Sequence, residues 1–179
     1  HRYKEPKAFP ALDPTSVVTI QLPRYNEMYV AEHLIDAVCA IDYPRELYEI
    51  QVLDDSTDET RSIAELAVRR YAAQGVDIKY IHREDRTGYK AGALEAGLKV
   101  SRGEFVGIFD ADFIPTADFL TRLIPPFRDP QIGMVQARWG HIHHDHPLLP
   151  EIPALPPHAH LTPAPPRRHP PERPSPATR

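Results

Sequence analysis

A short apolar run that ends in two carboxylates constrains this chain more than any other feature. Residues 105–109 (Phe-Val-Gly-Ile-Phe) predict a buried strand, and Asp110-Ala111-Asp112 follows it directly. Two carboxylates this close repel each other unless a cation lies between them. Because open α/β sheets bind ligands at the carboxyl ends of their strands, the pair predicts a divalent-metal site for a phosphorylated ligand. The alternative is a polar exit from a strand that carries an incidental acidic pair.

Strands and helices alternate along most of the chain. Apolar and β-branched runs predict strands over residues 17–22, 49–53, 77–82, 105–109 and 132–137. Apolar spacings of three and four predict a helix over 27–41 and a short one over 118–123. A further helix is predicted to end at Gly75, with an inner face formed by Ile63, Leu66, Ala67 and Tyr71. Another is predicted after residue 88, where Gly92 and Gly97 suit close packing. This rhythm predicts βαβ units and an α/β fold with a mostly parallel sheet.

Polar residues follow three of the predicted strands. Asn26 comes after the first strand, which Pro23 is expected to stop, while Asp54 finishes the second strand and Asp55 follows it. Asp110 follows the fourth strand. Since the carboxyl ends of parallel strands meet at one edge, we expect these side chains to lie together. Several polar strand ends at one edge favour a ligand site over an incidental acidic pair.

The residue types at this edge suit a nucleotide diphosphate. Asp55 can accept a hydrogen bond from a base N–H group, and Asp110 and Asp112 can supply oxygen ligands to Mg²⁺ or Mn²⁺. Lys90 and Arg86 lie near a predicted helix start, where positive charge and backbone N–H groups suit phosphate. The alternative for Lys90 is a place on a solvated helix face.

Composition excludes several classes of protein. Residues 1–146 carry a net charge of −6, so they lack the basic face that a nucleic-acid partner requires. The single cysteine, Cys39, excludes a disulfide within the chain and fits a reducing compartment. No run reaches the roughly 18 to 20 apolar residues of a membrane span, and no signal-peptide pattern opens the chain. The first strand is followed by neither Gly-x-Gly-x-x-Gly nor a Walker motif, which argues against dinucleotide oxidoreductases and P-loop NTPases.

Four motifs occur in order at the predicted sheet edge. They are Pro-x-Tyr-Asn-Glu at 23–27, Asp-Asp-Ser-x-Asp at 54–58, Arg-Thr-Gly-Tyr-Lys-Ala-Gly-Ala-Leu at 86–94 and Phe-Asp-Ala-Asp at 109–112. Together they resemble the family 2 glycosyltransferases. The chain is most similar to the processive, membrane-embedded branch that contains cellulose-synthase-like and glucomannan-synthase-like enzymes, and the likeness covers about residues 17–139.

The resemblance implies a GT-A fold over residues 17–140 and inverting transfer of a hexose from a donor such as UDP-glucose or GDP-mannose to a growing β-glycan. It also implies a parent protein embedded in an inner, plasma or Golgi-type membrane, with this domain facing the cytoplasm. By position in the motifs, the resemblance places Tyr25, Glu27 and Asp55 against the base and ribose, with Pro23 and Arg86 as further donor-binding residues. It places Lys90 near the diphosphate, Asp110 by the sugar-phosphate and Asp112 on Mg²⁺ or Mn²⁺.

The chain departs from the family pattern downstream of the metal motif. The family's catalytic base lies in a Thr-Glu-Asp-type motif that is followed by Gln-x-x-Arg-Trp, and residues 136–139 (Gln-Ala-Arg-Trp) are one residue short of the second motif and come too early. The chain also starts at His1. We therefore expect a fragment that binds donor and metal without transferring sugar. A non-catalytic nucleotide-sugar-binding protein is compatible with the same motifs.

The composition changes after residue 140. Twelve of the 21 prolines and seven of the ten histidines fall from residue 141 onward. Because proline removes a backbone donor and restricts the chain, residues 141–179 are expected to be disordered or extended, and residues 1–16 to form an extended lead-in. Residues 141–146 also fit the His-x-His-x-Asp-His pattern of metallo-β-lactamase-like zinc hydrolases, which is the alternative function. Adventitious metal binding by a histidine-rich loop explains the same residues.

Overall fold

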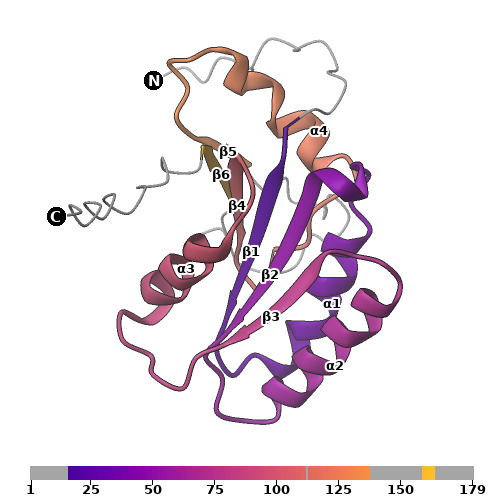
Figure 1. The fold of residues 1–179 in the computed structure, drawn as a ribbon, viewed down its shortest axis with the longest axis vertical. Coiled ribbons are helices and arrows are strands. Elements are labelled where there is room, and N and C mark those ends of the chain that lie inside the picture. Colours follow the sequence, from indigo (N-terminus) through magenta and orange to yellow (C-terminus); the bar gives the residue numbers. More distant parts are fainter. Residues whose placement is uncertain (1–15, 112, 138–158, 164–179) are drawn as a thin grey trace, which may run out of the picture.

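The computed structural model describes residues 16–111, 113–137 and 159–163. The strands among them form one six-stranded sheet with the order β3-β2-β1-β4-β6-β5 (Figure 1). Strands β1 to β4 run parallel, and β6 is antiparallel to both of its neighbours. The strands are β1 (Val18–Arg24), β2 (Tyr48–Asp54), β3 (Ile78–His82), β4 (Phe105–Phe109), β5 (Val135–Ala137) and β6 (Ala159–Pro163). The predicted α/β class with a mostly parallel sheet is confirmed.

Helices cover both faces of the sheet. Helices α1 (Met28–Cys39) and α2 (Thr60–Ala73) lie side by side on one face, and α3 (Tyr89–Val100) lies on the other (Figure 1). The short helix α4 (Phe119–Leu123) and the 3₁₀ turns η1 (Arg45–Leu47) and η2 (Pro125–Arg128) complete the described part. None of the helices in these ranges combines the length and the apolar character that crossing a membrane requires.

Close packing of α3 on the sheet depends on a glycine. A Cβ atom at Gly97 would lie 2.5 Å from the Nε2 atom of Gln21 and 2.7 Å from the Oε1 atom of Gln51. These two amides hydrogen-bond each other across β1 and β2 at 3.0 Å, and Gln21 also donates to the carbonyl of Leu94 at 3.3 Å. The prediction that Gly97 suits close packing is confirmed at the sheet, whereas Gly92 packs against the loop residues Thr87 and Arg83.

Two element predictions need correction. Pro23 does not stop the first strand, because β1 continues to Arg24. The strand tolerates proline there because β4 pairs with β1 only as far as Gln21, so no ladder on that side needs the missing N–H group. In α2 the inner face consists of smaller residues than predicted, because Leu66 is 70% exposed whereas Ala64 and Val68 are buried beside Ala67.

Residues 159–163 belong to the predicted disordered or extended tail, and they join the sheet. They form β6, which lies between β4 and β5, and Leu161 at its centre is fully buried opposite Gly107. Pro163 fits this strand because residues beyond Leu161 pair with β4 alone. Of the two predicted alternatives, disordered or extended, these five residues are extended, and they pair within the sheet. The remainder of the predicted tail, including the histidines of residues 141–146, and the lead-in up to residue 15 lie outside the described residues.

Candidate functional site

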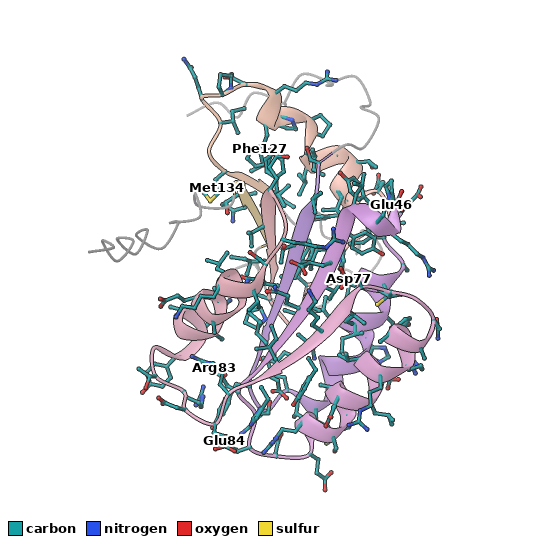
Figure 2. The ribbon with its side chains drawn as sticks, in the orientation of Figure 1. Glu46, Asp77, Arg83, Glu84, Phe127 and Met134 are labelled. Atoms are coloured by element: carbon teal, nitrogen blue, oxygen red, sulfur yellow. The ribbon has the colours of Figure 1, made fainter. Side chains whose placement is uncertain are left out.

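The carboxyl ends of the parallel strands meet at one edge, as predicted. Arg83 and Glu84, which follow β3, mark this edge at the lower end of the sheet in Figure 2, whereas Glu46 and Asp77 mark the opposite end. Strands β1 and β2 finish together, with Arg24 paired to Asp54. Residues that follow four separate strands therefore border this edge.

The exits of β1 and β2 are tied together by side-chain hydrogen bonds. The amide N–H of Asn26 donates to Ser56 Oγ at 2.9 Å, and its side-chain Oδ1 accepts from the Thr57 amide at 2.9 Å. Asn26 adopts a left-handed conformation (φ 53°), which asparagine tolerates better than most residues. The loops that carry the first and second motifs thus form one unit.

Asp54 has a structural role at the end of β2. Its carboxylate is fully buried and accepts hydrogen bonds from the Ser56 amide at 2.9 Å and from the Tyr80 hydroxyl at 2.6 Å. Burial, together with the Asp54 carboxylate, raises the pKa of Tyr80 well above its ordinary value. Asp54 finishes the strand as predicted, which leaves Asp55 as the acidic group toward the ligand edge.

Asp55 is paired with an arginine that the sequence analysis did not select. Arg83 donates to both carboxylate oxygens, with Nε 2.8 Å from Oδ1 and Nη2 2.5 Å from Oδ2. The hydrogen bond to Asp55 raises the pKa of Arg83. Only 4% of the Asp55 side chain is exposed, so a base N–H group could reach only the exposed part of its carboxylate. A carboxylate offers about four acceptor positions, so acceptor capacity remains after both arginine bonds.

Tyr25 and Arg86 bring the first and third motifs into contact. The guanidinium carbon of Arg86 lies 3.3 Å from the centroid of the Tyr25 ring and 5.4 Å from that of Tyr89. Such stacking is a cation–π interaction. The Tyr25 side chain is 39% exposed at the end of β1, so an aromatic face and a positive charge border the same surface. Arg86 thus lies against a ring that the resemblance assigns to the base.

Lys90 and Asp110 form an ion pair across the edge. The Lys90 ammonium, in the first turn of α3, donates to Asp110 Oδ1 just after β4. The Lys90 side chain is nevertheless 53% exposed, so it reaches Asp110 from a solvated helix face, as the alternative described. About a third of the Asp110 side chain is exposed, so a divalent cation or a hydrogen-bond donor of a ligand can approach it. Asp112 lies outside the described residues.

The remaining predicted residues occupy the start of this edge. Pro23 is buried within β1 opposite Leu53, and Glu27 is exposed at the N-terminus of α1. Pro23 thus shapes the strand end, whereas Glu27 is accessible from solvent.

Arg24 is a second residue that sequence reasoning missed. It is 4% exposed, and its three guanidinium nitrogens have no hydrogen-bond partner among the described residues. Burial lowers the pKa of Arg24 to about 10, and the charges of Glu27 and Asp54 oppose this shift. An arginine beside a proline at a strand end resembles many surface arginines, so its burial becomes visible only in the folded chain.

The sequence of the chain matches a known protein family. The family model of Glycosyl transferase family 2 matches residues 19–155. The chain belongs to this family. It is 48% identical over 138 residues to glucomannan 4-beta-mannosyltransferase 2 of Arabidopsis thaliana, and 44% identical over 138 residues to glucomannan 4-beta-mannosyltransferase 1 of Cyamopsis tetragonoloba. Each alignment covers 74% of this chain and 26% of the relative, so the chain spans about a quarter of the length of these curated relatives.

Solved structures agree with the family and the fold. The chain is similar to the mannosyltransferase PcManGT from Pyrobaculum calidifontis in complex with GDP-Man and Mn²⁺, with a TM-score of 0.59, 36% identity, and coverage of 72% of this chain and 38% of that one. It is also similar to S. aureus TarS 1-349 in complex with UDP-GlcNAc, with a TM-score of 0.50, 30% identity, and coverage of 58% and 29%. These neighbours confirm the predicted GT-A fold.

The zinc-hydrolase alternative finds no support in these comparisons, all of which point to glycosyltransferases. Within the part of the chain that the structure describes, no group of three or more His, Cys, Asp or Glu side chains could hold a metal ion. The histidine cluster of residues 141–146 lies outside that part.

Proposed function

We propose that this chain binds a nucleotide-diphosphate sugar together with a divalent cation at the carboxyl edge of its sheet, as the donor half of an inverting glycosyltransferase. The observation that carries the proposal is the meeting of Lys90 and Asp110, which come from different elements. The ammonium group of Lys90 suits a diphosphate, and the carboxylate of Asp110 suits a hard cation. The pair therefore offers a complementary charge to each part of a metal–diphosphate complex.

The residues at the metal end fit Mg²⁺ or Mn²⁺. Asp110 presents carboxylate oxygen, the ligand type that these cations prefer, and its present partner is itself a cation, Lys90. Asp112, two residues further along the chain, would supply a second carboxylate. When bound, the cation would stabilise the negative charge of the leaving diphosphate. Lys90 would then donate to a phosphate oxygen.

The base end is formed by the exits of β1 and β2. Tyr25 offers a half-exposed aromatic face on which a base or ribose can lie, with Arg86 stacked against it. Asp55 would accept a base N–H at the rim of its carboxylate, and Glu27 would face the ribose from the start of α1. Pro23 keeps the end of β1 in the extended form that presents Tyr25.

The names of the relatives indicate which sugar donor and which product to propose. Glucomannan 4-beta-mannosyltransferases are 44–48% identical to the chain, and the PcManGT structure contains GDP-Man and Mn²⁺. We therefore propose GDP-mannose as the first donor to test, with UDP-glucose as the second. A growing β-glycan is the proposed acceptor, and the parent protein is proposed to be membrane-embedded.

Isothermal titration of the chain with each donor tests the function. With Mn²⁺ present, the wild-type chain should bind GDP-mannose or UDP-glucose, and chelation by EDTA should abolish binding. Asp112→Ala should weaken binding of the donor by about tenfold or more, since it removes a charged metal ligand. Glu95→Gln, which removes an exposed carboxylate on α3, is the matched control and should bind as the wild type does. Equal binding with EDTA, or undiminished binding by Asp112→Ala, would contradict the proposed metal site.

A further inference from the structure

Arg83 contacts two parts of the proposed donor site at once. Two of its guanidinium nitrogens donate to the Asp55 carboxylate at 2.8 Å and 2.5 Å. The same guanidinium donates from Nη1 to the carbonyl of Thr87 at 3.2 Å and from Nη2 to the carbonyl of Tyr89 at 3.0 Å. One side chain at the end of β3 therefore joins the end of β2 to the segment that opens α3.

The segment that Arg83 holds is conformationally unusual. Gly88 has φ 76° and Tyr89 has φ 49°, so two successive residues lie in the left-handed region. For Tyr89 this conformation costs free energy, and it persists only when surrounding contacts enforce it. The two carbonyls that accept from Arg83 belong to Thr87 and Tyr89, on either side of Gly88. Lys90 is the next residue, so its position follows from that of this segment.

The link is shielded and depends on the shape of arginine. The Arg83 side chain is 16% exposed and that of Asp55 is 4% exposed, so solvent and salt screen this pair less than a surface pair. The planar guanidinium reaches both carboxylate oxygens and the two carbonyls together. A lysine keeps the charge, but its compact ammonium cannot reproduce this set of bonds.

We propose that Arg83 is a positioning residue that sets the base end of the donor site, at Asp55, in a fixed relation to the diphosphate end, at Lys90. This proposal rests on the proposed function. Arg83 acts through Asp55 and through the Thr87–Tyr89 carbonyls rather than by contact with the transferred sugar. Loss of the guanidinium would leave both ends present and the distance between them undefined.

Titration of Mn²⁺–GDP into four variants tests this role. Arg83→Lys should bind GDP about tenfold or more weakly than the wild type, because charge alone does not restore the bonds. Asp55→Asn, Arg83→Gln and the double variant form a cycle, and the double variant should lose about as much affinity as the weaker-binding single variant. Arg69→Lys, which alters an exposed ion pair with Glu65 on α2, is the control and should bind normally.

Amide hydrogen exchange on the unliganded chain gives a second readout. The Tyr89 amide donates to Arg86 and the Gly92 amide donates to Gly88, and both should exchange faster in Arg83→Lys than in Arg69→Lys. Arg83→Lys with normal GDP affinity, or losses that multiply in the double variant, would overturn the proposal. A wild-type chain that binds no nucleotide would overturn the proposed function and the binding role of Arg83. Unchanged exchange would overturn the link itself, whether or not nucleotide binds.

Discussion

Replacing Gly92 by alanine is expected to reduce binding of the donor nucleotide about tenfold or more and to destabilise the fold by about 1–3 kcal/mol. A Cβ atom at this position would lie 2.1 Å from the Thr87 carbonyl oxygen and 2.7 Å from Arg83 Nη1. The backbone of the loop or of α3 must therefore move, which displaces Lys90 and breaks the contacts of Arg83. Titration with Mn²⁺–GDP and urea unfolding measure the two effects.

The sign of the stability change makes this test discriminating. At an unobstructed position inside a helix, glycine to alanine stabilises by about 1 kcal/mol, the opposite of the expected result. Gly133→Ala is the matched control, because a Cβ atom at Gly133 would meet no atom of the described residues within 4 Å. It should bind GDP and unfold like the wild type. A Gly92→Ala variant of raised stability and normal affinity would show that α3 does not pack against the loop as described.

Truncation of Leu161 to alanine is expected to lower the free energy of unfolding by about 2–5 kcal/mol. The Leu161 side chain is fully buried at the centre of β6, where Gly107 of β4 leaves room for it. Removing it leaves a cavity in the hydrophobic core, because the surrounding structure relaxes only partially after such a truncation. Chemical unfolding followed by circular dichroism measures the loss.

Leu66→Ala is the matched control for this second change. Leu66 is 70% exposed on α2, so the same truncation there should change stability by less than about 0.5 kcal/mol. Equal effects of the two truncations would mean that residues 159–163 do not pack in the sheet.

The parallel core and the ligand edge could be predicted from the sequence because their signals are local. The run from Phe105 to Phe109 is bounded and apolar, and it forms β4 with the predicted bounds. Polar residues after three strands predicted one shared edge, and the ion pair of Lys90 with Asp110 shows that the third and fourth motifs meet there. Apolar periodicity and the alternation of strands and helices along the chain are sufficient for conclusions of this kind.

The contacts of Arg83 and the place of β6 could not be predicted because they depend on pairing between distant segments. Asp55 meets Arg83 because Asp54 pairs with His82 in the sheet, a register that the sequence does not display. The strand over residues 159–163 lies in a proline-rich stretch, and its only buried apolar residue with described burial is Leu161. Tertiary pairing, rather than local propensity, determines both features.

The comparison of two lysines on α3 tests the central claim most directly. Lys90 pairs with Asp110 at the sheet edge, whereas Lys99 lies in the last turn of the same helix, 72% exposed. Titration with Mn²⁺–GDP should show an affinity loss of about tenfold or more for Lys90→Ala and less than about twofold for Lys99→Ala. Equal affinities of the two variants would contradict the claim that the edge between Lys90 and Asp110 binds the diphosphate.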